Sequence, residues 1–405
     1  GKTLLKNYRY PLVKIKAIQG STVEAPEDIL DYVKQENEEL YNIILPHADK
    51  RRQSVVKRKF KKVSKYTLHE QYQKSVENVR VKVQNGEKVN VVFLVNMLSM
   101  FPAEALMNEM LNDEMFDVRL FVIPDFRFGH DEEISMVNET YNTLKEKYPF
   151  VKCAVDIKND EIVEYNDVIK GADIVCYPSP YDVSYSLYNP YYAAQNGILS
   201  IHINYGFFRS KYDRFIYSLD NYNNFWRVFL ETELNMEEYR EYGQNQGSNA
   251  VVTGYSKMDR MSEYLSDRKE NERKTIIIAP HHSVKGGHND TLALSNFESY
   301  SDLFLELPKL YPQIDFIFRP HPVLFKFLRG KSNWGEERVD AYLEKMLSNK
   351  NVVYSTEGDY LETFAKSDGI IQDCGSFLVE YFYTKKPCCY MLKSPEDIDD
   401  KFSDL

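Results

Sequence analysis

The sequence predicts an α/β protein made of two consecutive Rossmann-like domains, each built on a parallel sheet covered by helices. Three observations lead to this prediction. Short apolar runs rich in Val, Ile and Phe alternate with segments of helical periodicity, which is the pattern of parallel strands with crossover helices. The alternation starts again after a charged stretch at residues 262–273. The chain has 405 residues, which is too long for one hydrophobic core.

Each half of the chain supplies its own series of elements. In the first half, strands are expected at residues 91–95, 116–123, 148–155, 174–177, 198–203 and 251–254, with helices at 103–111, 132–147 and 162–170. In the second half, strands are expected at residues 274–279, 315–318, 352–354, 369–372 and 388–391, with helices at 300–311, 339–347, 360–366 and 377–383. We therefore divide the chain into residues 1–85, 86–265 and 266–405. We expect the last domain to be truncated, because the sequence stops inside a polar segment.

The composition argues against several classes of protein. The 61 acidic residues outnumber the 51 basic ones and give a net charge of −10, which disfavours a general nucleic-acid binder. No apolar run approaches the about 20 residues that a membrane-spanning helix needs. The polar N-terminus has no apolar segment like that of a secretory signal. Five cysteines without a CxxC pair indicate reduced thiols, so we expect a cytoplasmic protein.

The first 85 residues differ from the rest of the chain. Residues 24–45 have the apolar spacing of a helix, and a run rich in Lys and Arg follows at residues 50–65. A run of this kind is usually a solvated helix face or a connector. The alternative is a surface that meets anionic lipid or a polyanionic acceptor, which would place the protein at the inner face of the cell membrane.

The first candidate site is a strand-to-helix turn near the C-terminus. The apolar strand at residues 369–372 is followed by Asp373, and Gly375 and Ser376 then open a helix, so these three residues are candidate substrate contacts. A helix N-terminus presents free backbone N–H groups and a positive dipole end, which suit a phosphate. Glu380 lies one helical turn further on, where its carboxylate would accept hydrogen bonds from a ribose diol. The alternative is an ordinary turn in which Ser376 only caps the helix.

The second candidate site follows the strand at residues 315–318. This strand delivers Arg319 and His321 to its carboxyl end, and Pro320 and Pro322 stiffen the backbone around the histidine. Ligands of open α/β sheets bind at the carboxyl ends of strands. The Arg–His pair therefore suits a pyrophosphate, because Arg offers planar charge-assisted donors and His donates a bond or a proton. The alternative is a loop histidine that caps backbone groups.

Two further segments carry polar residues near strand ends. His202 lies in the apolar strand at residues 198–203, just before a glycine turn. It is a candidate general base towards an acceptor hydroxyl, and the alternative is a satisfied core histidine. Thr253 and Gly254 end a strand and precede a helix, which by itself is a weak signal.

A further candidate segment is a histidine-rich loop. His281, His282 and His288 follow the strand at residues 274–279 and invite comparison with a metal site. No cysteine is nearby, and the glycine pair at residues 286–287 predicts a mobile loop, which disfavours a tight metal site. We expect His281 and His282 to face phosphate groups or the acceptor instead. We expect no catalytic metal and no cofactor.

In order and spacing, these motifs resemble those of the CDP-glycerol glycerophosphotransferase family, whose members build teichoic acids and related capsular polymers. Residues 373–387 are similar to the family's D-x-S-S-x-x-x-[DE]-Y…KKP stretch, and residues 319–322 to its R-x-H-P. Residues 253–259 resemble its TGYPRND, and His202 falls at the histidine of its HGTPLK. The resemblance extends over residues 90–392.

The resemblance implies a GT-B fold, with an active site in the cleft between two Rossmann-like domains. It also implies transfer of glycerol phosphate from CDP-glycerol to a hydroxyl of a glycan or polyol-phosphate polymer, with release of CMP. Residues 86–265 would be the acceptor domain, and residues 266–405 the nucleotide-binding domain. The implied roles are a general base for His202, pyrophosphate contacts for Arg319 and His321, phosphate binding for Ser376 and a ribose contact for Glu380.

The sequence also departs from the family pattern. After His202 it has INYG instead of GTPLK, Gly375 replaces a serine, and residues 279–282 have APHH where the family has Ala-Pro-Thr. These changes suggest a divergent branch that acts on a capsule or lipopolysaccharide sugar, with another polyol phosphate such as ribitol phosphate as the group transferred. Two alternatives remain open: a GT-B glycosyltransferase that uses a nucleotide sugar, and a non-catalytic scaffold of capsule assembly anchored through residues 1–85.

Overall fold

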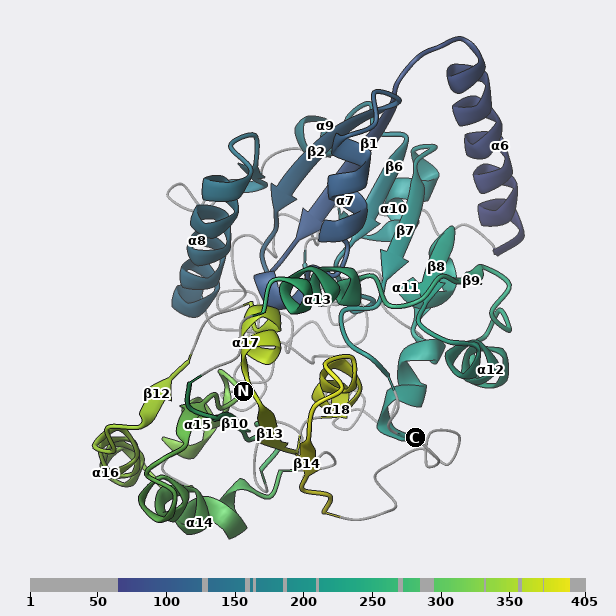
Figure 1. The fold of residues 1–405 in the computed structure, drawn as a ribbon. Coiled ribbons are helices and arrows are strands. Elements are labelled where there is room, and N and C mark those ends of the chain that lie inside the picture. Colours follow the sequence, from purple (N-terminus) through teal and green to yellow (C-terminus); the bar gives the residue numbers. More distant parts are fainter. Residues whose placement is uncertain are drawn as a thin grey trace, which may run out of the picture. The chain divides into compact units, whose positions relative to one another are not determined.

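The computed structural model describes most of the chain from Lys65 onward. The described residues are 65–125, 130–156, 161–162, 165–184, 188–208, 211–268, 272–284, 295–330, 333–355, 359–373 and 375–393. These residues form two parallel sheets with helices packed on them, as the sequence predicts (Figure 1). The helix expected at residues 24–45 and the basic run at residues 50–64 lie outside the described residues.

The first sheet has seven strands in the order β3-β2-β1-β6-β7-β8-β9. Their bounds are β1 Val89–Val95, β2 Phe116–Val122, β3 Lys152–Cys153, β6 Ile174–Tyr177, β7 Leu199–Ile203, β8 Arg227–Leu230 and β9 Ala250–Val252. β1 reads VNVVFLV and is buried at every position except Asn90, as expected for a central strand covered on both faces. It pairs in parallel with β2 on one side and with β6 on the other. The strand order therefore reverses between β1 and β6.

Helices and short elements surround this sheet. They are α6 Lys65–Gln84, α7 Glu104–Leu111, α8 His130–Lys147, α9 Tyr165–Val168, α10 Pro190–Gln195, α11 Asp220–Asn224 and α12 Glu233–Tyr242, two 3-10 helices at Leu98–Met100 and Lys211–Ser218, and an antiparallel pair of β4 Val155–Asp156 with β5 Glu161–Ile162. α6 docks on β7 because Leu68 and Tyr72 share a core cluster with Leu199. The Tyr72 hydroxyl also lies 2.8 Å from the Ser200 hydroxyl of that strand.

The second sheet has five parallel strands in the order β12-β11-β10-β13-β14. Their bounds are β10 Thr275–Ala279, β11 Asp315–Phe318, β12 Val352–Tyr354, β13 Gly369–Gln372 and β14 Cys388–Tyr390. The helices are α13 Lys257–Ser266, α14 Phe297–Leu310, α15 Leu324–Leu328, α16 Glu336–Leu347, α17 Leu361–Lys366 and α18 Gly375–Phe382. Side chains alternate between the two faces of a strand, so the neighbours Ile277 and Ile278 belong to different core clusters.

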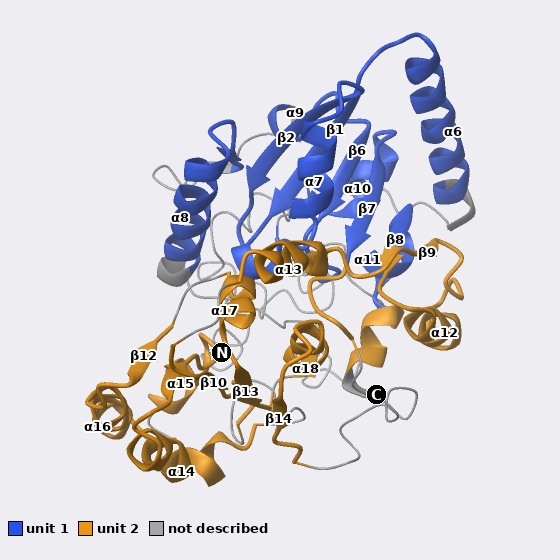
Figure 2. Cartoon of the chain, viewed as in Figure 1, with its two compact units in different colours: residues 1–203, 219–228 blue, residues 204–218, 229–405 orange. Residues whose placement is uncertain are grey.

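The chain separates into two compact units (Figure 2). Unit 1 contains residues 1–203 and 219–228, and unit 2 contains residues 204–218 and 229–405. Unit 2 therefore includes the second sheet together with the segments that follow β7 and β8. Among the described residues, no helix is both long enough and apolar enough to cross a membrane.

Candidate functional site

Unit 2 gathers three of the sequence motifs at one edge of its sheet. Ile278 of β10 lies opposite Phe318 of β11, and Ala279 lies opposite Gln372 of β13, so the three strands end at nearly the same level. The residues that follow are His281 after β10, Arg319 and His321 after β11, and Asp373 after β13. The two histidine loops are held together because the His321 backbone N–H donates to the Pro280 carbonyl at 2.9 Å. The parallel sheet therefore brings together residues that are far apart in the sequence. The backbone N–H of His281 donates to the carboxylate of Asp373, 92 residues further along the chain.

Three imidazole rings form a compact cluster at this edge. The ring centres of His281 and His282 are 4.1 Å apart, those of His282 and His321 are 4.1 Å apart, and those of His281 and His321 are 5.3 Å apart. His288, which the sequence grouped with the first two, lies outside the described residues. The cluster joins His281 and His282 to the Arg-Pro-His-Pro segment.

The hydrogen bonds of the cluster define the protonation of the rings. Nδ1 of His321 accepts the backbone N–H of Val323 at 3.2 Å, and Nδ1 of His281 lies 2.8 Å from the Ser283 hydroxyl and accepts the Ser283 backbone N–H. A neutral ring whose Nδ1 accepts carries its proton on Nε2. Burial, and then the neighbouring imidazoles, hold the pKa of both rings well below the usual value. Both rings are therefore neutral at pH 7 and present Nε2–H donors.

The same cluster has the spacing of a metal site. One ring nitrogen from each of His281, His282 and His321 lies within 4.8 Å of the others. A metal-bound histidine normally donates its other ring N–H to a carbonyl or a carboxylate. Nδ1 of His321 instead accepts a backbone N–H, which leaves the proton on the nitrogen that a metal would need. This hydrogen bonding favours donors aimed at an anion over a metal centre.

Arg319 is tied to the rest of the site through Tyr360. The arginine is 8% exposed, and its guanidinium donates to the Ser355 hydroxyl at 2.5 Å. Its guanidinium carbon lies 5.6 Å from the centre of the Tyr360 ring. The ammonium group of Lys257 lies 4.2 Å from the same ring centre. Two cations therefore share one aromatic ring in this part of unit 2.

Asp373 is occupied by the protein itself. It is 1% exposed, and its oxygens accept the His281 backbone N–H at 2.6 Å, the Ser295 hydroxyl at 3.0 Å and the Asn296 backbone N–H at 2.6 Å. Burial raises the pKa of this carboxyl to about 6, and these hydrogen bonds act in the opposite direction. The sequence suggested a substrate contact for Asp373. The geometry favours a positioning role, in which the carboxylate fixes the backbone of the His281 loop.

The N-terminus of α18 lies against the segment that follows β7. Ser376 is partly exposed, and a Cβ placed on Gly206 would lie 3.7 Å from the Ser376 Cβ. Gly206 belongs to the INYG stretch that departs from the family pattern. A methyl group at position 206 would therefore make ordinary van der Waals contact with Ser376, in the predicted phosphate-binding turn. Both residues belong to unit 2.

Glu380 forms a buried network that sequence reasoning missed. The carboxylate is 0% exposed and accepts the Tyr255 hydroxyl at 2.7 Å and the Tyr360 hydroxyl in a short bond. The Lys257 ammonium lies 3.8 Å from the carboxylate and donates to the Tyr360 hydroxyl at 2.5 Å. The carboxylate is fully buried, so a ribose contact requires the displacement of a side chain that covers it. Lys257 lies within the TGY-like stretch, whereas no sequence pattern pointed to Tyr360.

Thr253 and Gly254 lie at the exposed end of the same stretch. Both residues are exposed, and the Thr253 backbone N–H donates to the Leu230 carbonyl at 3.0 Å. Gly254 has φ of +89°, which glycine adopts without strain. The turn that they form aims the chain so that Tyr255 and Lys257 enter the Glu380 network. Their own contact with a substrate remains a prediction.

His202 lies in unit 1 and has a different environment. The side chain is 0% exposed, stacks on Phe225 with ring centres 5.1 Å apart and meets the edge of Tyr222. Its Nδ1 lies 2.9 Å from the Tyr177 carbonyl, which accepts the proton of that nitrogen. This tautomer makes Nε2 the basic nitrogen, as a general base requires. The complete burial of the ring between aromatic side chains favours the alternative, a core histidine.

Comparison with known proteins supports the fold. The chain matches no protein-family model, and no curated protein matches it. Among solved structures it is similar to a UDP-N-acetylglucosamine 2-epimerase, with 14% identity and a TM-score of 0.50 over 76% of this chain and 79% of that one. The UDP-GlcNAc 2-epimerase from Neisseria meningitidis (15% identity, TM-score 0.46, 74% and 81% covered) and the wall teichoic acid polymerase TagF (12%, 0.45, 80% and 79%) are also similar. The likeness concerns the fold, which is GT-B as the motif resemblance implied.

Proposed function

We propose that this chain is a transferase that moves a polyol phosphate from a CDP-polyol to a hydroxyl of a cell-surface glycan or a teichoic-acid-type acceptor and releases CMP. The group transferred in this proposal is glycerol phosphate. The observation that carries the proposal is the placement of Arg319 and of the neutral imidazoles of His281 and His321 directly after neighbouring strands, at one sheet edge. A guanidinium and two N–H donors match the charge and the hydrogen-bond acceptors of a diphosphate.

In the proposed reaction, the acceptor oxygen attacks the phosphorus that bears the polyol. The bridging P–O bond to CMP breaks, CMP leaves with the bonding electrons, and the acceptor proton passes to a base. Arg319 offsets the charge on the non-bridging oxygens, and the Nε2–H groups of His281 and His321 donate to the diphosphate. The N-terminus of α18 with Ser376 supplies further donors. Reactions of this kind depend on positioning and charge stabilisation more than on covalent help.

The proposal gives Glu380 an indirect role. Its carboxylate holds the hydroxyl of Tyr360, and Tyr360 carries Arg319 on its ring. We therefore place Glu380 behind the diphosphate contacts, as a positioning residue. The cytidine ribose then lies nearer the exposed face of α18.

His202 is retained in the proposal as the candidate base, because its Nε2 is the basic nitrogen. Its burial makes this the part of the mechanism that most needs a test. The comparison of His202 and His321 variants in the Discussion provides that test.

The experiment is a product assay with three donors. The protein is incubated with CDP-glycerol, CDP-ribitol or UDP-N-acetylglucosamine and a glycan acceptor, and the released nucleotide is separated by chromatography. Calorimetric titration of each donor reports binding without an acceptor. We expect CMP from a CDP-polyol and binding that His321→Ala weakens.

Three outcomes would redirect the proposal. Binding of the UDP-sugar with no response to either CDP-polyol would favour the glycosyltransferase alternative. Release of CDP instead of CMP would show that the polyol is transferred without its phosphate. Binding of no donor by the wild type, with capsule assembly unaffected by His321→Ala in cells, would favour the scaffold.

We also propose that the protein acts in the cytoplasm at an anionic membrane surface, through residues 50–65. Their abundance of Lys and Arg supports this proposal. Replacing Lys57, Arg58, Lys59, Lys61 and Lys62 by Gln tests it by sedimentation with vesicles of phosphatidylglycerol. Unchanged sedimentation would return the segment to the role of a solvated connector.

A further inference from the structure

Ser355 lies beside Arg319 at the carboxyl edge of the second sheet. The serine directly follows β12, and the arginine directly follows β11. The last residues of these two parallel strands, Phe318 and Tyr354, are register partners. One residue further on, the Ser355 backbone N–H donates to the Phe318 carbonyl at 3.0 Å. The backbone pairing of neighbouring strands therefore holds the serine next to the arginine, before any side-chain contact is considered.

The Arg319 guanidinium is anchored by two side chains. Its Nη1 donates to the Ser355 hydroxyl at 2.5 Å, and its central carbon lies 5.6 Å from the centre of the Tyr360 ring. An arginine side chain has many rotamers, so its planar fork of donors binds a ligand more tightly when its orientation is fixed in advance. The hydroxyl and the ring supply that orientation, and the bond to Ser355 uses one of the five N–H donors of a guanidinium.

Both of these anchors are uncharged. Elsewhere in unit 2 an arginine is held by a carboxylate, as Arg329 is by Asp340 at 2.6 Å. An ion pair of that kind offsets the positive charge of the guanidinium before any ligand arrives. A serine hydroxyl fixes the guanidinium of Arg319 and leaves its charge in place. That charge is what an anionic ligand at this edge would meet.

We propose that Ser355 is a positioning residue of the proposed diphosphate site, which fixes the Arg319 guanidinium without cancelling its charge. This inference rests on the proposed function, because it takes Arg319 as the diphosphate contact. Residue 355 then has to be both a hydrogen-bond acceptor and neutral. Alanine fails the first requirement, aspartate fails the second, and threonine meets both.

The experiment is a calorimetric titration of CDP-glycerol, UDP and inorganic pyrophosphate into the wild type, Ser355→Ala, Ser355→Asp and Ser355→Thr. Ser348→Ala is the matched control, since the Ser348 hydroxyl donates to the Lys345 carbonyl at the exposed end of α16. Ser355→Ala is also made in the Arg319→Ala background, and the rate of CMP release is measured for this pair. A residue that acts through Arg319 has no further effect once Arg319 is gone. Thermal melting checks that each variant folds.

We expect Ser355→Ala to weaken binding of CDP-glycerol three- to tenfold and Ser355→Asp to weaken it at least thirtyfold. Ser355→Thr and Ser348→Ala should stay within twofold of the wild type. UDP and pyrophosphate should follow the same order, because they carry the same diphosphate. Ser355→Asp should melt no lower than Ser355→Ala, since the carboxylate still holds the guanidinium. A merely structural serine would not lose binding when a stronger anchor replaces it. In the Arg319→Ala background, Ser355→Ala should change the rate of CMP release by less than twofold.

Two results would overturn the role of Ser355. One is binding of CDP-glycerol by Ser355→Asp as tight as that by the wild type, which would leave the proposed function intact. The other is a further loss of rate when Ser355→Ala is added to Arg319→Ala. Binding of UDP or pyrophosphate in the expected order, with no binding of CDP-glycerol, would instead count against the CDP-polyol of the proposed function and support the role of Ser355.

Discussion

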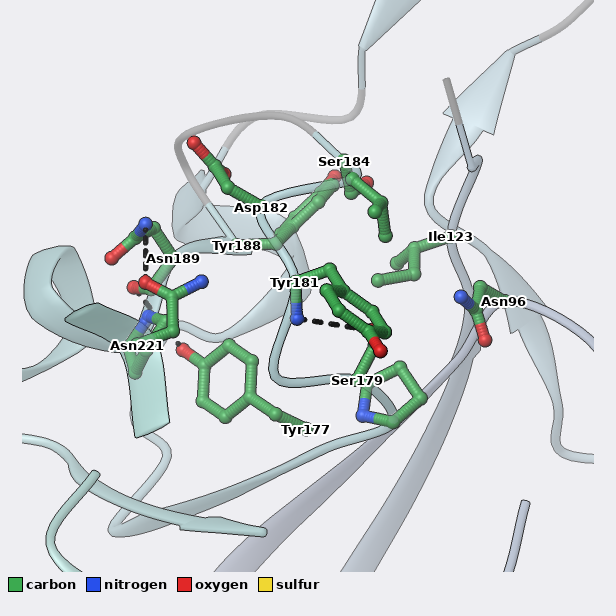
Figure 3. Close-up of a pocket in the computed structure, with 13 residues that line it drawn as sticks. Asn96, Ile123, Tyr177, Ser179, Tyr181, Asp182, Ser184, Tyr188, Asn189 and Asn221 are labelled. Carbon is green, nitrogen blue, oxygen red and sulfur yellow. Dashed lines mark hydrogen bonds between the residues drawn. The ribbon is translucent and has the colours of Figure 1, made fainter. Parts of the chain in front are cut away.

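The carboxyl edges of the two sheets have the same backbone geometry and different chemistry. At the second sheet, Arg319 and the neutral imidazoles follow neighbouring strands, and Arg319 shares the Tyr360 ring with Lys257. At the first sheet, the described residues that line a small pocket (Figure 3) combine amides, hydroxyls and a carboxylate with apolar and aromatic side chains, and they include no Lys, Arg or His. A parallel sheet therefore supplies a place for a ligand, and the few residues after each strand decide which ligand fits. The second edge carries the cationic group that the proposed diphosphate needs, and the described pocket lining of the first edge carries none.

The hydrogen-bond network of Glu380, which supports the second edge, gives the largest expected effect on the free energy of unfolding. Glu380→Ala should lower the free energy of unfolding by about 3–5 kcal/mol, because it leaves Lys257 and two tyrosine hydroxyls buried without their shared acceptor. Chemical denaturation followed by fluorescence measures this change. Glu362→Ala is the control, since Glu362 forms an exposed pair with Lys366 one helical turn away. If the two variants are equally stable, the Glu380 network is not what holds this edge together.

Arg319 tests the charge at the second edge directly. Arg319→Ala should reduce the rate of CMP release by about a hundred- to a thousandfold, as expected when a donor to a developing negative charge is lost. Arg319→Lys should recover part of the rate, because the charge remains while the planar pair of donors is lost. Arg329→Ala is the control, because its guanidinium pairs with Asp340 at the surface. An unchanged rate of CMP release in Arg319→Ala would show that the diphosphate does not bind at this edge.

Variants of the two histidines test whether His202 is the base of the proposed reaction or a core residue. His202→Ala should lower the free energy of unfolding by about 2–3 kcal/mol, because a fully buried ring leaves a cavity beside Phe225. His321→Ala should change stability by less than about 1 kcal/mol and slow CMP release about ten- to a hundredfold, the cost of a lost hydrogen bond to a charged group. Denaturation and the CMP assay are run on both variants. A His202→Ala protein that is as stable as the wild type but releases no CMP would support His202 as the catalytic base.

The site also shows which structural features of this molecule can be predicted from its sequence. The β10, β11 and β13 strands are compact apolar runs, so their carboxyl ends and the meeting of His321 with His281 follow from the rules of parallel sheets. β8 at Arg227–Leu230 was missed, because four residues among frequent aromatics give no periodicity. Whether the His202 ring lies in a core or in a site depends on how its strand packs against the distant Phe225. No local sequence pattern encodes that packing. Tyr360 joins Glu380 only through packing between α17 and α18, and the sequence carries no sign of that contact.

The smallest expected effect compares two buried carboxylates of unit 2. Glu380 has two tyrosine donors and a nearby ammonium, whereas Glu231, which follows β8, has the Asn204 amide at 3.1 Å and one oxygen without a partner among the described residues. Burial first, and then the charge of Asp213, raises the pKa of Glu231 to about 8, against the hydrogen bonds of the backbone and Asn204. The folded protein therefore holds this proton more tightly than the unfolded chain. The resulting stability is fully present below about pH 4.5 and is lost as the pH rises through about 8.

Glu231→Gln should remove this loss, since the amide keeps the shape of the protonated acid and does not titrate. Between pH 6.5 and 8.5, the free energy of unfolding of the wild type should fall by about 1–2 kcal/mol more than that of the variant. This window lies above the pKa of about 6 to which burial raises Asp373, so that carboxyl adds little to the difference. Denaturation at several pH values measures the slopes, and Glu237→Gln on the exposed face of α12 should reproduce the wild-type slope. Parallel slopes in wild type and Glu231→Gln would mean that Glu231 is already ionised, and hence that a cation or water reaches the end of β8.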